Sequence, residues 1–159
     1  MPSILFVCTA NQFRSPLAAA IFKSKLQEEN RRGKWEVASA GTWTVPGLPI
    51  DRRLHELAQG LGVDLAETTT TLVEGSLLSH YDLILVMEAG QKEAILSEFP
   101  SVRSHVYLIS EVVDDAVYDI KDPARNNVDP DKIARELKDT IDRGYQKICK
   151  LAKTLHAAA

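Results

Sequence analysis

The sequence is short of the residues and patterns that mark several large classes of protein. Its 159 residues include only two cysteines, too few for a disulfide framework, and its four histidines show no metal-ligand spacing. No apolar run approaches the roughly 20 residues of a membrane-spanning helix, and no basic segment opens the chain as in a secretion signal. The net charge is −3 and no basic run stands out, which argues against nucleic-acid binding. We therefore expect a cytoplasmic protein with no metal or other cofactor and with neither nucleic acid nor a membrane as partner.

Two nucleotide-binding motifs are also absent. No G-x-G-x-x-G follows the first apolar run, which excludes a dinucleotide-binding domain, and no G-K-[ST] is present, which excludes a nucleotide-binding P-loop. The composition is otherwise ordinary for a globular protein, with 45% hydrophobic and 26% charged residues. The length suffices for one domain with a proper core, so we expect a single domain over residues 1–159.

Apolar runs and amphipathic stretches alternate along the chain, which is typical of an α/β fold with a parallel sheet. Buried strands are predicted at residues 4–7, 35–40, 82–87 and 106–109. Helices are predicted at residues 15–30, 51–60, 72–79, 89–99 and 130–155, with an irregular stretch at 62–72 and a mixed one at 110–128. Four parallel strands with covering helices make a three-layer αβα domain, in which ligands bind at the carboxyl ends of the strands.

Residues 4–16 carry the strongest functional signal. The apolar run at their start predicts a buried strand, and Cys8 follows it directly. The five-residue loop 9–13 then leads to Arg14, which opens a helix. A tight loop between a strand and a helix turns backbone N–H groups inward at the positive end of the helix dipole, so it suits a tetrahedral oxyanion. These groups favour an attacking thiolate at Cys8, while the Arg14 guanidinium can hold two phosphoryl oxygens.

The pattern C-x5-R-S directly after the first strand resembles the signature of the low-molecular-weight protein tyrosine phosphatases. The matching residues are Cys8, Asn11, Arg14, Ser15 and Pro16. The resemblance covers nearly the whole chain and implies strand order 2-1-3-4 with a phosphate-binding loop after strand 1. It implies hydrolysis of phosphate monoesters, first of all protein phosphotyrosine, through a cysteinyl-phosphate intermediate. Cys8 would be the nucleophile, Arg14 the phosphate clamp and Ser15 a hydrogen-bond donor to the sulfur, with capping of the following helix as the alternative for Ser15. Asn11 would hold the loop through a left-handed or side-chain hydrogen-bonded geometry.

The same family takes its general acid from an Asp-Pro pair in the loop before the last helix, and this chain has two such pairs. Asp129-Pro130 has a structural explanation, because aspartate as N-cap followed by proline is a favoured start for a long helix. Asp122-Pro123 lies seven residues earlier, where the sequence indicates no helix to cap. We therefore expect Asp122 to be the general acid of the first step and the general base of the second.

Substrate binding is expected at the loop residues and at one aromatic side chain. The predicted set is Thr9, Ala10, Asn11, Gln12, Phe13, Ser15 and Trp43. Trp43 lies in a loop rich in proline and glycine, where it could be an aromatic wall of the site or a packed core residue; Tyr118 is a second candidate wall. Ala10 replaces the glycine common in the family, and alanine tolerates a positive φ poorly. Gln12 matches neither the aliphatic residue of tyrosine-specific members nor the threonine of phosphoarginine-specific ones.

Three alternatives to a tyrosine phosphatase stay open on the same scaffold. The first is a protein-arginine phosphatase. The second is an arsenate reductase, which in its relatives uses a further pair of cysteines, whereas residues 60–100 contain none. The third is a phosphate-dependent binding module without turnover. For the enzyme we expect a phosphorylated protein as substrate, and a monomer or a weak dimer as the working form.

Overall fold

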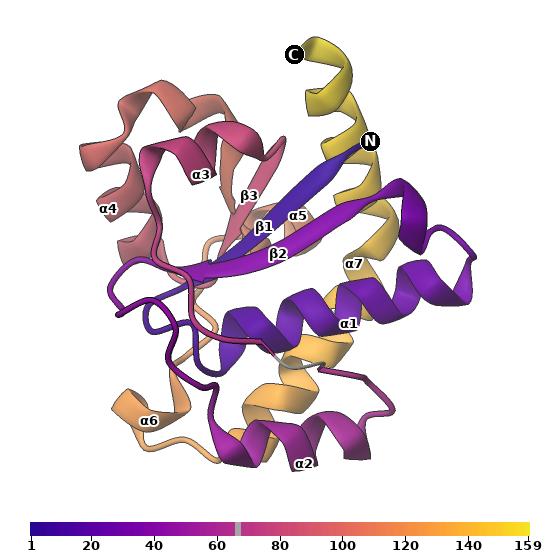
Figure 1. Cartoon of the computed structure of the whole chain (residues 1–159), viewed down its shortest axis with the longest axis vertical. Coiled ribbons are helices and arrows are strands. Elements are labelled where there is room, and N and C mark those ends of the chain that lie inside the picture. Colours follow the sequence, from indigo (N-terminus) through magenta and orange to yellow (C-terminus); the bar gives the residue numbers. More distant parts are fainter. Residues whose placement is uncertain (66–67) are drawn as a thin grey trace.

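The fold is organised around a central strand whose two faces are both covered. The computed structural model describes residues 1–65 and 68–159, so the prediction of an irregular stretch at 62–72 lies partly outside the described residues. Four parallel strands form one sheet in the order β2-β1-β3-β4 (Figure 1). Their bounds are β1 Ser3–Cys8, β2 Glu36–Gly41, β3 Leu83–Val86 and β4 Val106–Leu108. The expected three-layer αβα architecture and strand order are confirmed.

Seven α-helices and two 3-10 helices connect the strands within the described residues. Their bounds are α1 Arg14–Glu28, η1 Arg32–Lys34, α2 Arg52–Gly60, α3 Gly75–His80, α4 Ala89–Glu98, η2 Pro100–His105, α5 Ile109–Asp114, α6 Pro123–Asn126 and α7 Pro130–Ala158. Within the described ranges, no helix is long and apolar enough to span a bilayer.

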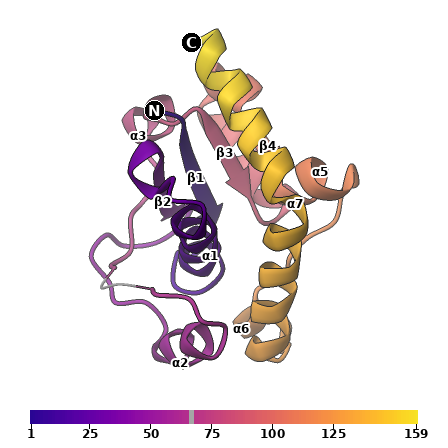
Figure 2. The ribbon, with the colours of Figure 1, turned by 90° about the vertical axis from the view of Figure 1, so that its right-hand side faces the viewer.

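The side chains of β1 alternate between two apolar clusters. Ile4 and Phe6 pack with the helices α1, α2, α5 and α7, whereas Leu5 and Val7 pack with α3, α4 and η2 on the other face. Every residue of β1 is buried, because a parallel sheet covered on both faces leaves no polar side of the strand. Figure 2 shows α2 and α6 at the end of the molecule opposite to the two termini.

Two predictions about the segment before α7 are wrong. Ile109, expected to end a strand, begins α5, and the mixed stretch 110–128 contains the rest of α5 and all of α6. Asp122 does have a helix to cap: it is the N-cap of α6, and its side chain accepts a hydrogen bond from the Ala124 backbone N–H at 2.9 Å. A four-residue helix has too few positions to show a period of 3.6 residues, so the sequence pattern did not reveal it.

The loops that follow β1 and β2 meet at the carboxyl end of the sheet. The backbone N–H of Thr42 donates to the carbonyl of Cys8 at 2.9 Å, and that of Trp43 donates to the carbonyl of Thr9 at 3.0 Å. Gly41 makes this close approach possible, because a Cβ at that position would lie 2.5 Å from the Thr9 carbonyl oxygen. The loop after β2 is therefore fastened directly to the loop after β1.

Candidate active site

The loop after β1 is held in shape by Asn11. This residue has a left-handed backbone with φ of 59°, and its side-chain amide donates to Ser15 Oγ at 2.8 Å and to Ser39 Oγ at 2.9 Å. Its Oδ1 accepts from the Thr71 backbone N–H at 2.8 Å. The expected geometry of Asn11 is thus confirmed, and Ala10 has no need of a positive φ because the left-handed position falls one residue later.

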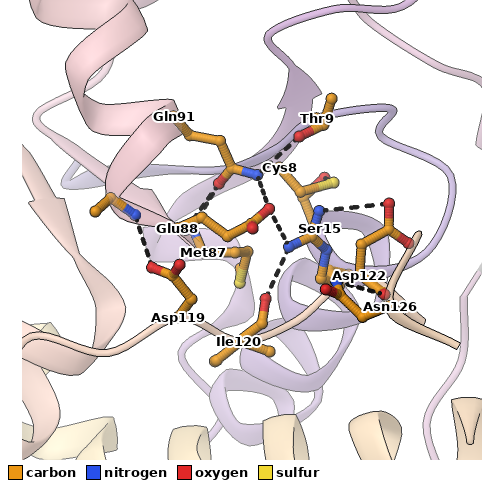
Figure 3. Close-up of polar contacts among 12 residues, drawn as sticks. Cys8, Thr9, Ser15, Met87, Glu88, Gln91, Asp119, Ile120, Asp122 and Asn126 are labelled. Carbon is orange, nitrogen blue, oxygen red and sulfur yellow. Dashed lines mark hydrogen bonds and ion pairs between the residues drawn. The ribbon is translucent and has the colours of Figure 1, made fainter. Parts of the chain in front are cut away.

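Cys8 lies at the bottom of this loop, with 2% of its surface exposed. Its Sγ is 3.0 Å from Ser15 Oγ in the first turn of α1 (Figure 3). The capping alternative for Ser15 is wrong, because the N-cap of α1 is Phe13 and makes no side-chain capping bond. A hydroxyl at this distance can donate a hydrogen bond to a thiolate and so stabilise its charge.

Arg14 is almost completely buried, and its guanidinium is held by two acceptors from distant parts of the chain. Its Nη1 donates to Glu88 Oε2 and to the Ile120 carbonyl oxygen, both at 2.7 Å (Figure 3). Its Nη2 lies 3.9 Å from Asp122 Oδ2. A buried cation needs such partners, since desolvation of an unpaired charge is costly. With Nη1 taken up by the protein, Nε and Nη2 are the atoms left to hold phosphoryl oxygens.

Glu88 and Gln91 connect this guanidinium to the phosphate-binding loop. The two residues form a capping box at the start of α4. The Gln91 side-chain amide donates to Glu88 Oε2 and to Thr9 Oγ1, both at 3.1 Å. Neither residue was among the predicted site residues, and glutamate is not one of the favoured N-cap residues that would have marked this helix start in the sequence.

The Glu88 carboxylate gives a test of how much the fixed position of Arg14 matters. In Glu88→Gln the neutral amide cannot offset the buried guanidinium, so Arg14 should lose its fixed orientation. We expect kcat/KM for para-nitrophenyl phosphate to fall by about tenfold, the effect of weakening one charge-assisted hydrogen bond.

The matched control for Glu88→Gln is Glu111→Gln. Glu111 also forms an ion pair with a cation, Lys92 of α4, at 2.9 Å, but it lies between α4 and α5 away from the phosphate-binding loop. We would measure kcat/KM for para-nitrophenyl phosphate and the melting temperature of both variants. Only Glu88→Gln should lose activity beyond what a change in stability explains. An equal loss in both would mean that Glu88 supports α4 and not the orientation of Arg14.

A cavity of about 110 Å³ opens above Cys8. It is lined by Cys8, Ala10, Gln12, Phe13, Arg14, Asp51, Arg53, Asp122, Pro123 and Ala124. Six of the predicted site residues therefore line one cavity. They are Cys8, Arg14, Asp122 and the loop residues Ala10, Gln12 and Phe13. Thr9 lines a neighbouring cavity of about 380 Å³ instead, while Asn11 and Ser15 lie behind the loop and fix its shape.

Asp122 lines the cavity, but the expectation that selected it from the sequence, that it has no helix to cap, is wrong. It caps a helix just as Asp129 does, since Asp129 Oδ1 accepts from the Asp131 backbone N–H at 3.0 Å at the start of α7. The two aspartates differ in position, because only Asp122 lines the cavity and lies near Arg14. Capping and a place at the cavity are compatible, since each uses a different carboxylate oxygen.

The two aromatic residues proposed as walls do not line this cavity. Trp43 is 84% exposed, so the core alternative for it is wrong. The Tyr118 hydroxyl donates a short hydrogen bond to the Asp114 carboxylate, which itself pairs with Arg143. Burial and then this bond raise the pKa of Tyr118 to about 12. Phe13, which is 8% exposed, is the aromatic residue that the cavity does contain.

Asp51 and Arg53 stand at the mouth of the cavity and were not predicted as site residues. Asp51 caps α2 through the Arg53 backbone N–H at 2.9 Å and pairs with the Arg53 guanidinium at 3.2 Å. Partial burial alone would raise the pKa of the Asp51 carboxyl, but the hydrogen bonds and charge of Arg53 outweigh it and hold this pKa below its ordinary value. The ion pair with Arg53 therefore stabilises the ionised form of Asp51 and disfavours its protonated form.

No group of three or more histidine, cysteine, aspartate or glutamate residues is arranged to hold a metal ion in residues 1–65 and 68–159. The chemistry that the cavity offers is that of its own thiol, guanidinium and carboxylates. Together they can bind a tetrahedral dianion, attack it in line and protonate the group that leaves.

Comparisons with known proteins agree with this reading. A family model described as "Low molecular weight phosphotyrosine protein phosphatase" matches residues 3–158. A probable low molecular weight protein-tyrosine-phosphatase EpsP from Ralstonia nicotianae is 34% identical over 142 residues, which are 89% of this chain and 90% of the relative. A protein-arginine-phosphatase from Bacillus subtilis is 30% identical over 150 residues, which are 94% and 96% of the two chains. The crystal structure of a low molecular weight protein tyrosine phosphatase from T. tengcongensis matches with a TM-score of 0.83 and 30% identity, covering 92% of this chain and 99% of that one.

Proposed function

Because the chain belongs to the low-molecular-weight phosphotyrosine protein phosphatase family, we propose that it hydrolyses phosphotyrosine in proteins by way of a cysteinyl-phosphate. In the first step the Cys8 thiolate attacks phosphorus, an S–P bond forms, and the P–O bond to the tyrosine breaks. Asp122 gives its proton to the departing phenolate oxygen. In the second step Asp122 takes a proton from water, the water oxygen attacks phosphorus, and the S–P bond breaks to release inorganic phosphate and the thiolate.

One observation carries this proposal: the thiol and the guanidinium at the two ends of one loop, and the Asp122 carboxylate from a distant part of the chain, line the same small cavity. The Glu88 carboxylate accepts a hydrogen bond from Arg14 Nη1 and so fixes the guanidinium. The other N–H groups of Arg14 can then donate to the equatorial oxygens of the phosphoryl group as negative charge develops on them. Ser15 Oγ, at 3.0 Å from the sulfur, supports the thiolate as it leaves in the second step.

Asp122 is the better of the two carboxylates at the cavity for the role of proton donor. The Asp51 carboxylate pairs with the Arg53 guanidinium, which holds the pKa of this carboxyl below its ordinary value and so disfavours its protonated form. Asp122 lies 3.9 Å from Arg14 Nη2, the guanidinium nitrogen left to hold a phosphoryl oxygen. The assignment of Asp122 therefore rests on its place at the cavity beside Arg14 and on the ion pair that engages Asp51.

The working form that we propose is a single phosphatase domain over residues 1–159, acting in the cytoplasm as a monomer or a weak dimer. Its partner would be a phosphorylated protein, and no metal or other cofactor enters the two steps above. Cys8 and Cys149 are free thiols, as a nucleophile of this kind requires.

A protein-arginine phosphatase is the second candidate, and the lining of the cavity favours it in one respect. A phosphoarginine guanidinium needs hydrogen-bond acceptors, and the Asp51 and Asp122 carboxylates both line the cavity. Gln12, which also lines the cavity, adds a third acceptor. Its amide nitrogen donates to the Pro49 carbonyl at 3.0 Å, so its amide oxygen is the atom that can accept a hydrogen bond from a substrate. A relative named protein-arginine-phosphatase shares 30% of aligned residues with this chain.

A panel of phosphotyrosine, phosphoarginine and phosphoserine peptides of one sequence tests the proposal and its alternative. We expect phosphotyrosine to be hydrolysed and phosphoserine to be resistant, because a phosphate on a short side chain does not reach a sulfur that is 2% exposed. A kcat/KM that is higher for phosphoarginine than for phosphotyrosine would move the assignment to the second candidate. Binding of inorganic phosphate without hydrolysis of any peptide, or of para-nitrophenyl phosphate, would leave a binding module and overturn the proposal.

A further inference from the structure

The two acceptors that hold Arg14 Nη1 come from segments that are also bonded to each other. Glu88 is followed by Ala89, the first residue of α4, and Ile120 is preceded by Asp119. The Asp119 Oδ1 accepts a hydrogen bond from the Ala89 backbone N–H at 2.9 Å (Figure 3). Hydrogen bonds and peptide bonds therefore form a closed ring that starts and ends at the same nitrogen atom and passes through Glu88, Ala89, Asp119 and Ile120.

The Ala89 N–H is one of the first backbone donors of α4, which have no acceptor within their own helix. The capping box serves other groups of this helix start, since the Gln91 side-chain oxygen accepts from the backbone N–H groups of Met87 and Glu88. The first turn of α4 contains no acidic residue of its own. The Asp119 carboxylate therefore supplies, from another segment, both the acceptor and the negative charge that a helix N-terminus favours.

The segment that carries Asp119 is fixed on both sides of this residue. On one side the Ser110 hydroxyl, completely buried in α5, donates to the Tyr118 carbonyl at 3.0 Å and accepts from the Tyr118 backbone N–H at 3.2 Å. On the other side Ile120 is also completely buried, and its backbone N–H donates to the Met87 carbonyl at 2.9 Å. The backbone of Asp119 is therefore held in place, so its carboxylate joins two fixed segments of the chain.

Asp119 lies outside the cavity above Cys8. It lines the neighbouring cavity of about 380 Å³, as Glu88 and Gln91 do. A residue in this place acts on a phosphoryl group at the sulfur only through the orientation of Arg14. Such an action is effective, because catalysis depends steeply on the position of the groups that hold the reacting atoms.

We propose that Asp119 is a positioning residue for the phosphate clamp. The Asp119–Ala89 bond holds the Glu88 carboxylate and the Ile120 carbonyl at a fixed separation, and the guanidinium of Arg14 between them keeps the orientation in which Nε and Nη2 are left for phosphoryl oxygens. This inference rests on the proposed function and adds to it a residue that neither touches the substrate nor takes part in proton transfer.

The test removes and then restores the acceptor on Asp119. Asp119→Ala deletes it, and we expect kcat/KM for para-nitrophenyl phosphate to fall by about three- to tenfold, the effect of losing one capping hydrogen bond. The inhibition constant of inorganic phosphate should rise by a similar factor, because the same guanidinium holds the free anion. Asp119→Asn keeps an acceptor oxygen and should stay within about twofold of the wild type in both measurements.

Asp129→Ala is the matched control for Asp119→Ala. Asp129 also accepts a backbone N–H at the start of a helix, from Asp131 at 3.0 Å, but it does not line the cavity. Both Asp→Ala variants should lower the melting temperature, and only Asp119→Ala should change the inhibition constant of phosphate. If both variants raise that constant equally, or if Asp119→Ala lowers the melting temperature alone, Asp119 only stabilises the fold and the positioning role is overturned.

Glu88→Gln allows a second measurement, because it weakens the same ring at another bond. In the Glu88→Gln background, Asp119→Ala should lower kcat/KM by less than about twofold, since the ring is already open. In the Glu111→Gln background, where the ring is intact, Asp119→Ala should have its full effect. Losses from Glu88→Gln and Asp119→Ala that multiply would mean that the two residues act independently, which contradicts the ring.

The binding of inorganic phosphate separates this inference from the proposed function. A wild type that binds phosphate but hydrolyses neither the phosphopeptides nor para-nitrophenyl phosphate overturns the proposed function. The phosphate affinities of Asp119→Ala and Asp119→Asn then still test the positioning role. If the wild type hydrolyses para-nitrophenyl phosphate and Asp119→Ala equals it in kcat/KM and in the inhibition constant of phosphate, the phosphatase assignment stays and the positioning role is overturned.

Discussion

Replacing Cys8 with serine is expected to lower kcat by roughly 10⁴-fold or more, because it removes the attacking thiolate and leaves a hydroxyl that stays protonated at neutral pH. The substitution is close to isosteric, and the 3.0 Å contact with Ser15 Oγ can persist as a bond between two hydroxyls. The bonds of Asn11 and the bonds from Arg14 to Glu88 and Ile120 do not involve the sulfur. Cys8→Ser should therefore still bind inorganic phosphate, which a rise in melting temperature with added phosphate would report.

Cys149 provides the control for this substitution. It is a free cysteine that is also 2% exposed, and burial raises the pKa of its thiol, so it is an inert thiol within α7. Cys149→Ser should keep the wild-type kcat for para-nitrophenyl phosphate, even if the buried hydroxyl lowers the melting temperature. Turnover that survives in Cys8→Ser and disappears in Cys149→Ser would show that the nucleophile had been assigned to the wrong cysteine.

The part of the site that is local in sequence could be predicted from its own residues, whereas of the distant residues only Asp122 was predicted, and that through the family resemblance. Cys8 and Arg14 are six residues apart, and the buried strand before them and the helix after them leave visible patterns. The partners that hold Arg14 are different: Glu88 lies 74 residues away in sequence and Ile120 lies 106 residues away. A periodic sequence pattern does not relate positions so far apart, so Glu88 and Gln91 could be identified as site residues only from the folded structure.

The substrate-facing side of the site was the least predictable. An exposed tryptophan in a loop rich in proline and glycine has no periodic partner that would indicate whether it packs inward or outward. The outcome depends on Thr70, whose buried hydroxyl sets the course of the loop from more than twenty residues further along the chain. In the same way, Asp51 and Arg53 reach the mouth of the cavity because α2 begins beside Gln12, a tertiary contact that α2's own sequence does not encode.

The two Asp-Pro pairs give the sharpest test of the proton donor, because both aspartates cap a helix that begins with proline but only Asp122 lines the cavity. Asp122 and Asp129 each cap a helix whose first residue is proline, and each accepts a backbone N–H two residues ahead, at 2.9 Å and 3.0 Å. Asparagine is as good an N-cap as aspartate, so both Asp→Asn variants should fold with nearly unchanged melting temperatures. We expect Asp122→Asn to lower kcat by between about 10²- and 10⁴-fold and Asp129→Asn to leave it nearly unchanged.

The leaving group decides whether the loss in Asp122→Asn is a loss of proton transfer. The para-nitrophenolate anion is stable and departs with little help, whereas phenolate needs a proton as its bond to phosphorus breaks. The variant should therefore be impaired more with phenyl phosphate than with para-nitrophenyl phosphate, and single-turnover kinetics should place the difference in the first step. An equal loss with both esters would mean that Asp122 acts through its 3.9 Å approach to Arg14 and orients the guanidinium, and the proton donor would then have to be sought elsewhere.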